Sequence, residues 1–113
     1  KEFPMAPTTI FGRDIVYSGG GYFRLFPYMK IKSLTRQEDY VMTYFHIKDF
    51  DYAQERIYRS FKGEVALLRY IKKYYGLKGC FSKFCRLVSE FDFVSVEQAD
   101  KMIDWDQQPL LKL

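Results

Sequence analysis

Apolar residues in the second half of the chain recur every three to four positions, the period of a helix with one buried face. A first helix is predicted between Ser60, a candidate N-cap, and Gly76, which suits a helix end. A second follows it directly, and the capping-box spacing of Ser95 and Gln98 predicts a third that runs toward Ile103. The apolar positions are Phe61, Val65, Leu68, Ile71 and Tyr75 in the first helix and Phe81, Phe84, Cys85 and Val88 in the second.

The first half of the chain has shorter patterns. Two strand-like runs, Thr8–Phe11 and Ile15–Tyr17, are separated by a predicted turn over 12–14. Pro27 suits the first position of a helix that runs to about Arg36, because its missing N–H would have no partner there anyway. The pattern therefore predicts two short strands and then a helix.

Three consecutive glycines, Gly19, Gly20 and Gly21, precede that helix. Glycine admits positive φ and lets another group approach the backbone closely. The next residues, Tyr22–Phe26, are expected to form a tight turn.

Tyr40–Ile47 is the best strand candidate, because it is mostly aromatic or β-branched and has little polar alternation. Asp92–Val94 is interpreted as another short strand. The succession of strands and helices predicts an α/β fold with few short strands and about four helices. No repeat or linker divides residues 1–113, so we interpret them as a single unit. A sheet of these strands alone would have a poorly covered face, which favours a portion of a larger α/β barrel.

Composition and charge limit the size of the protein and the classes of function that it can have. The 113 residues allow one domain at most, and a hydrophobic fraction of 48% is typical of globular proteins. No apolar run reaches about 18 residues, which excludes a membrane-spanning helix. A net charge of +4 is too small to indicate nucleic-acid binding. The residues after Lys1 lack the apolar stretch of a signal peptide, and we interpret the chain as a piece of a longer protein.

Aromatic residues make up 19% of the chain, with 11 Phe, 10 Tyr and 1 Trp. So many rings can hardly all lie at the centre of a small core, so some are expected to line a groove or face a partner. An aromatic-rich core with tyrosine hydroxyls in water is an equal alternative. Cys80 and Cys85 lie on well-separated sides of one predicted helix, so we expect two buried, unbridged thiols and a reducing, cytoplasmic location.

His46 is the only histidine, and Asp49 and Asp51 follow it closely. A histidine beside carboxylates at a strand end can act as a general acid or orient a reacting water. The residues alone favour a partly buried histidine paired with a backbone group, and Asp49 and Asp51 suit an N-cap or turn. One histidine with scattered carboxylates falls short of the three protein ligands of a catalytic zinc site, so no metal ligand is assigned.

Three stretches carry a resemblance to a known family: Glu2–Pro4, Gly19–Tyr28 and Tyr44–Asp51. In order and spacing the set resembles the C-terminal part of NodB-like polysaccharide deacetylases, in the branch found in bacterial exopolysaccharide gene clusters. The resemblance implies that residues 1–113 are the C-terminal portion of a distorted (β/α) barrel, a fragment of a polysaccharide deacetylase domain.

That resemblance implies a metal-dependent N- or O-deacetylase. In the family an Asp and two His hold a divalent metal, often zinc, a further Asp is the base, and a late His is the acid. Only the late motif, Tyr44-Phe45-His46, maps here, with Tyr44 in place of the usual leucine and Ile47 where the branch often has proline. The resemblance makes His46 the acid and Tyr44 a wall of the acetyl pocket. It places Arg24 and the glycines Gly19, Gly20 and Gly21 beside the sugar groove.

The implied partners are an acetylated polysaccharide and the N-terminal half of the same barrel. The metal belongs to the parent enzyme, none is expected on this chain, and the chain alone is expected to be inactive. The alternative is a non-catalytic domain that binds glycan or protein, or self-associates as a homo-oligomer, through an exposed aromatic face.

Overall fold

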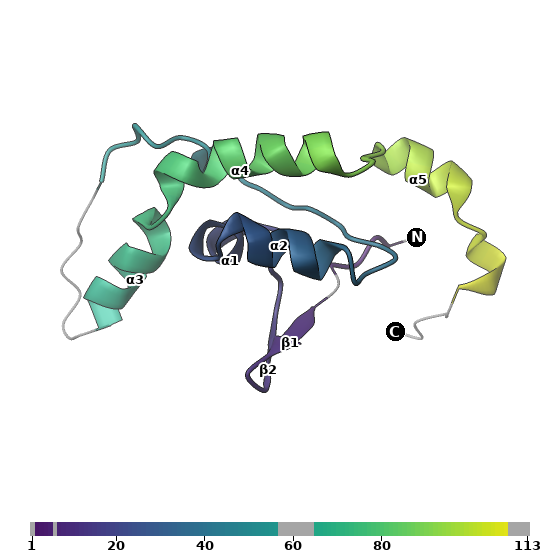
Figure 1. Ribbon diagram of the computed structural model, residues 1–113, viewed down its shortest axis with the longest axis horizontal. Coiled ribbons are helices and arrows are strands. Elements are labelled where there is room, and N and C mark those ends of the chain that lie inside the picture. The colour runs from purple at the N-terminus through teal and green to yellow at the C-terminus, as the bar shows by residue number, and fades with distance from the viewer. Residues whose placement is uncertain (1, 6, 57–64, 109–113) are drawn as a thin grey trace.

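The computed structural model describes residues 2–5, 7–56 and 65–108 and shows a helix-rich α/β protein (Figure 1). The predicted fold class, α/β with few short strands and about four helices, is confirmed. The described residues form one two-stranded sheet, and four of their five α-helices have seven residues or more. The elements are β1 (Thr8–Ile10), β2 (Arg13–Ile15), α1 (Gly20–Leu25), α2 (Tyr28–Thr35), the 3-10 turn η1 (Ile47–Asp49), α3 (Val65–Tyr74), α4 (Leu77–Glu90), α5 (Val96–Met102) and the 3-10 turn η2 (Trp105–Gln107).

The helices spread around α4 instead of closing into a compact body. α1 and α2 lie along one side of α4, α3 and α5 continue from its two ends, and the β1–β2 hairpin projects away from it (Figure 1). The radius of gyration is 16.5 Å and the principal extents are 50 × 36 × 27 Å. A compact domain of this length has a radius of gyration of about 13 Å. The fold therefore leaves an unusually large surface open.

The hairpin is tighter than the sequence predicted. Thr8 pairs with Ile15 and Ile10 with Arg13, so the turn is the two residues Phe11 and Gly12 and not 12–14. Both have positive φ, 50° and 72°, as a two-residue turn with the twist of the flanking strands requires. Phe11 is fully exposed at the tip.

Residues 22–25 form most of α1, with Phe26 as its C-cap, and not the isolated turn that we predicted over 22–26. The helix ends because Phe26 has an extended backbone and the following Pro27 cannot continue the hydrogen bonding. Pro27 is the N-cap of α2, one position before its predicted place, and Arg36 is the C-cap, which agrees with the predicted end.

The predicted strand Tyr40–Ile47 is wrong as regular structure, although part of it is extended. Its ladder contact is an isolated parallel bridge between Gly19 and Tyr44, and the Ser18 hydroxyl donates to the Met42 carbonyl at 2.7 Å. No second strand of the described residues runs along the segment. Asp92–Val94 is likewise an irregular connection between α4 and α5 and not a strand.

Gly76 separates α3 from α4, so the predicted helix stop is confirmed. Its φ of 71° is left-handed, and a Cβ there would lie 2.5 Å from the Arg24 carbonyl oxygen. Glycine is therefore required for both conformation and space. The candidate N-cap Ser60 and the neighbouring Phe61 lie outside the described residues.

The buried face of α4 agrees with the predicted one only at Phe84, which packs against the core. Leu77, Cys80 and Leu87 are buried, whereas Phe81, Val88 and Cys85 are exposed. The neighbouring α1 and α2 contact the stripe that begins at Leu77, and that packing decides which of two overlapping apolar stripes points inward. Both thiols are free, as expected, but only Cys80 is buried.

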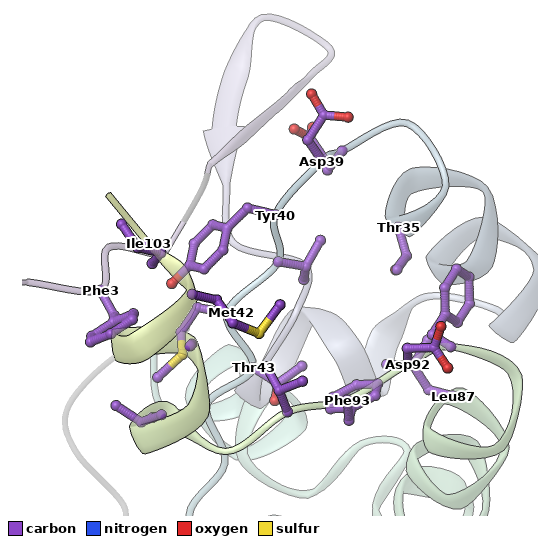
Figure 2. Close-up of a pocket in the computed structure, with 17 residues that line it drawn as sticks. Phe3, Thr35, Asp39, Tyr40, Met42, Thr43, Leu87, Asp92, Phe93 and Ile103 are labelled. Carbon is purple, nitrogen blue, oxygen red and sulfur yellow. The ribbon is translucent and has the colours of Figure 1, made fainter. Parts of the chain in front are cut away.

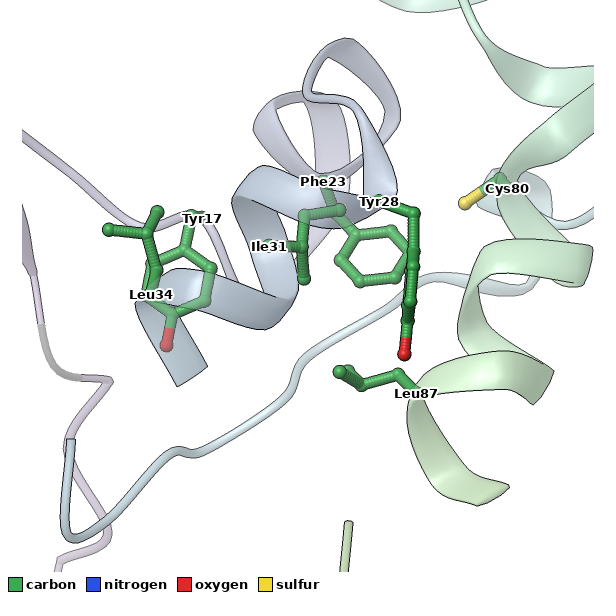
Figure 3. Packing of buried hydrophobic residues seen from close by; sticks show 7 residues of the cluster. All are labelled: Tyr17, Phe23, Tyr28, Ile31, Leu34, Cys80 and Leu87. Atoms are coloured by element: carbon green, nitrogen blue, oxygen red, sulfur yellow. The ribbon is translucent and has the colours of Figure 1, made fainter. Parts of the chain in front are cut away.

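The core lies where α1, α2 and α4 meet (Figure 3). It consists of Tyr17, Phe23, Tyr28, Ile31, Leu34, Cys80 and Leu87. Phe23 is completely buried, and its ring meets the Phe45 ring edge-on at 4.9 Å. Phe45 in turn packs on Phe84 of α4 at 5.2 Å. These contacts hold the extended segment before His46 against the helices.

The third predicted helix is confirmed. The Ser95 hydroxyl accepts from the Gln98 backbone N–H at 3.1 Å, and the Gln98 side chain accepts from the Ser95 N–H at 3.0 Å. This reciprocal capping box starts α5.

An ion pair joins α2 to the end of α4. Lys32 pairs with Glu90, and the Arg86 Nε donates to the same carboxylate at 3.0 Å. Hydrogen bonds from Lys32 first and then Arg86 lower the pKa of Glu90 from 4.5 to about 2. Because the unfolded chain binds this proton more readily, the stability that the Glu90 carboxylate contributes is fully present above about pH 4.5 and is lost as the pH drops toward 2.

We therefore expect Glu90→Gln to reduce the loss of folding stability that occurs as the pH falls. Between pH 5 and 2.5 the melting temperature of the unaltered chain should fall more steeply than that of the variant, as followed by circular dichroism. Glu97→Gln is the matched control, because the Glu97–Lys101 pair lies on an exposed face where ion pairs contribute little. Equal slopes for the unaltered chain and Glu90→Gln would contradict the assignment.

Candidate functional site

His46 lies at the end of the extended segment, directly before η1, with its side chain exposed. Its backbone N–H donates to Asp49 Oδ2 at 2.9 Å, and the Asp49 N–H donates to the His46 carbonyl at 2.8 Å. The Tyr44 ring stands edge-on to the imidazole, with centroids 5.1 Å apart. The main chain of His46 is thus fixed while the imidazole reaches solvent.

The alternative of a partly buried histidine is wrong, because the His46 side chain is exposed. The buried residue of the group is Asp49, with 4% exposure. The interpretation of the two aspartates as N-cap and turn residues is confirmed. Asp49 closes the turn that starts at His46, and Asp51 Oδ1 accepts from the Ala53 N–H at 3.1 Å.

Arg24 points into the protein and has 8% exposure. Its Nη1 donates to the Lys73 carbonyl at 2.5 Å and its Nη2 to the Lys72 carbonyl at 3.0 Å, both at the C-terminus of α3. Its Nε lies 3.7 Å from Asp49 Oδ1, within ion-pair range. The structure brings Arg24 to the His46 turn through Asp49, and its predicted contact with substrate stays a prediction.

The three glycines differ in what they do. A Cβ on Gly19 would overlap the Tyr44 carbonyl oxygen, so Gly19 allows the segment with His46 to lie against the start of α1. Gly20 has a positive φ of 56°, whereas a Cβ on Gly21 would meet its nearest neighbour at 3.8 Å. The structure therefore brings Gly19 and Tyr44 together, and their predicted contact with substrate stays a prediction.

Lys83 of α4 makes buried polar contacts that the sequence did not reveal. Its Nζ donates to the carbonyls of Phe23, Arg24 and Phe26 at 2.7, 2.8 and 2.8 Å, which caps the end of α1. Burial lowers the pKa of this amine. Nothing in the sequence pattern identified this contact, because it joins residues nearly sixty positions apart.

A pocket of about 390 Å³ lies elsewhere, between the segment before Tyr44 and α5 (Figure 2). Its apolar lining includes Phe3, Tyr40, Met42, Phe93 and Ile103. None of the predicted site residues lines it, so it is separate from the His46 site.

Large apolar side chains remain uncovered on α3 and α4. Leu67, Leu68 and Ile71 of α3 are 54, 59 and 46% exposed, and Phe81 of α4 is 57% exposed. Phe11, Tyr52 and Tyr75 are also exposed, so not all aromatic side chains lie in the core. That they face a partner stays a prediction.

The described part of the chain contains no cluster of three or more His, Cys, Asp or Glu side chains suited to a metal ion. In the same residues no helix is long and apolar enough to cross a bilayer.

Comparison with known proteins gives one family match. Neither the curated proteins nor the solved structures contain a match to the chain. Residues 1–101 match the family described as Domain of unknown function (DUF3473). Since the match spans most of the sequence, the chain belongs to the DUF3473 family.

Proposed function

We propose that the chain forms one side of the active site of a metal-dependent carbohydrate deacetylase, with His46 as the proton donor. The observation that carries the proposal is the combination of an exposed imidazole with a fixed main chain at His46. A general acid needs both features, because it must reach the leaving group and be held at hydrogen-bond distance from it. The resemblance of the Tyr44–Asp51 stretch to NodB-like deacetylases supports the same role.

The proton is needed when the acetyl group leaves. Hydrolysis adds a hydroxide oxygen to the acetyl carbon, and the C–N or C–O bond to the sugar then breaks. The departing nitrogen or oxygen takes a proton, which a protonated His46 ring donates. In the proposal Tyr44 forms a wall of the acetyl pocket, which its 49% exposure and its edge-on contact with the His46 ring support.

The described residues do not fit a metal site, so no metal-dependent step is assigned to them. In the proposal the metal ligands and the base come from the N-terminal half of the barrel. The uncovered apolar side chains of α3 and α4 suit a fold that another part of the enzyme covers. An acetylated polysaccharide is the proposed substrate, and the cytoplasm the proposed location.

The test joins this chain to the N-terminal half of the barrel and measures acetate release from an acetylated oligosaccharide. We expect zinc-dependent release, and His46→Ala should lower kcat by about 10²-fold or more, the usual contribution of a general acid. Lys48→Ala, two residues away and also exposed, should keep full activity. Full activity in His46→Ala would remove His46 from the mechanism.

The alternative is a non-catalytic domain that binds glycan or protein, or self-associates, through exposed aromatic residues. The fully exposed Phe11 and the half-exposed Phe81 favour it. Sedimentation of the purified chain with and without oligosaccharide separates the two. Concentration-dependent association of the chain, or oligosaccharide binding by the joined protein without acetate release, would favour the alternative.

A further inference from the structure

A continuous set of polar contacts leads from the end of α3 to His46. It starts at the Lys72 and Lys73 carbonyls, which accept from the Arg24 guanidinium. It continues through the Arg24–Asp49 ion pair, and ends at the His46 N–H, which donates to Asp49. Two of its members, Arg24 and Asp49, are buried, with 8% and 4% exposure.

Stability alone is a poor explanation for this arrangement. A buried ion pair is often no more stabilising than apolar side chains of the same volume, because desolvation of both charges offsets their attraction. The two buried groups do, however, fix the orientation of the His46 turn relative to the end of α3. The planar Arg24 guanidinium contacts two carbonyls and the Asp49 carboxylate at the same time. The other oxygen of that carboxylate accepts from the His46 N–H.

We infer that Arg24 and Asp49 are positioning residues that tie the His46 turn to the C-terminus of α3. A displacement of α3 then moves Arg24, Asp49 and His46 together. The positioning of His46 by these residues does not depend on the proposed function, whereas its consequence for catalysis rests on that function. α3 projects from the rest of the protein (Figure 1). Its Leu67, Leu68 and Ile71 side chains are exposed, so a partner that covers them could displace the helix.

The single histidine gives a direct test in the purified chain by NMR, without any activity. In Asp49→Ala the His46 amide should exchange with solvent at least about tenfold faster, since it loses its carboxylate acceptor, and the imidazole signals should shift. Asp49→Asn should restore much of the amide protection, because its side-chain oxygen can still accept. Asp51→Ala is the matched control and should leave His46 unchanged, since Asp51 Oδ1 accepts from Ala53. Unchanged His46 signals in Asp49→Ala, or equal changes in Asp51→Ala, would overturn the inference.

The α3 end of the connection is tested at Ile71, which lies far from His46 in sequence. Ile71→Pro should kink α3 at the turn before Lys72 and shift the His46 signals, because proline removes a helical hydrogen bond and clashes with the preceding turn. Ile71→Ala, at the same half-exposed position, should not. If Ile71→Pro is unfolded, Arg24→Lys is tested in its place, since lysine keeps the charge but cannot contact both carbonyls and Asp49. His46 signals that stay fixed in a folded Ile71→Pro or Arg24→Lys protein refute the connection.

Kinetics of the joined enzyme separate this inference from the proposed function. Asp49→Ala should lower kcat with little change in KM, as expected of a residue that acts through His46, and Asp49→Asn should recover part of the loss because its side-chain oxygen can still accept from the His46 N–H. Absence of acetate release in the unaltered joined enzyme refutes the proposed function, while the NMR result still decides the positioning role. Equal kcat in Asp49→Ala and the unaltered enzyme counts against positioning.

Discussion

Phe23→Ala is expected to remove most of the free energy of unfolding of the chain at 25 °C. The Phe23 side chain is completely buried, packs edge-on against Phe45 and lies under the Lys83 amine, 5.5 Å from its ring centroid. Truncation of a buried phenylalanine costs about 3–5 kcal/mol, through lost apolar burial and the cavity that remains. Total stabilities are about 5–15 kcal/mol, and so open a fold should lie toward the low end.

Urea denaturation followed by circular dichroism measures this loss. Phe11→Ala is the control, because it removes the same side chain from a position that is fully exposed. Surface changes of this kind stay within about 0.5 kcal/mol. A loss below about 1 kcal/mol in Phe23→Ala would mean that the core does not depend on the contact between α1 and the segment that carries Phe45.

The elements that the sequence predicted well are those with local signals. Gly76 is required by its own conformation, and the Ser95–Gln98 box is closed by residues three positions apart. Tyr40–Ile47 failed for the opposite reason. Its residues favour a strand, but a strand needs a partner at hydrogen-bond distance, and the described residues offer only the bridge at Gly19.

The same division holds in the candidate site. His46 and the turn-forming Asp49 could be found from the sequence, because both belong to one short segment. The positions of Arg24 and Lys83 could not, because each is set by carbonyls of distant elements. Lys83 had the pattern of a surface lysine on α4, and only the packing of α1 against that helix makes it a cap.

Gly19 links the packing of the fold to the candidate site. A larger residue does not fit at this position for steric reasons. Its φ of −166° is ordinary extended backbone, which any residue adopts. A Cβ would overlap the Tyr44 carbonyl oxygen, and a backbone carbonyl on the other side of a bridge cannot rotate away as a side chain does. Relief therefore requires the Tyr44–His46 segment to move.

We accordingly expect Gly19→Ala to cost about 1–3 kcal/mol in the free energy of unfolding, the usual range for an overpacked site. Gly21→Ala is the matched control, because its new Cβ would meet ordinary contacts at 3.8 and 3.9 Å. His46 imidazole signals should shift in Gly19→Ala and stay in place in Gly21→Ala. In the joined enzyme Gly19→Ala should lose about 10²-fold in kcat, since displacement of a reacting group by about 1 Å has effects of that size. Equal stability and equal His46 signals in the two variants would show that the glycine contact does not set the position of His46.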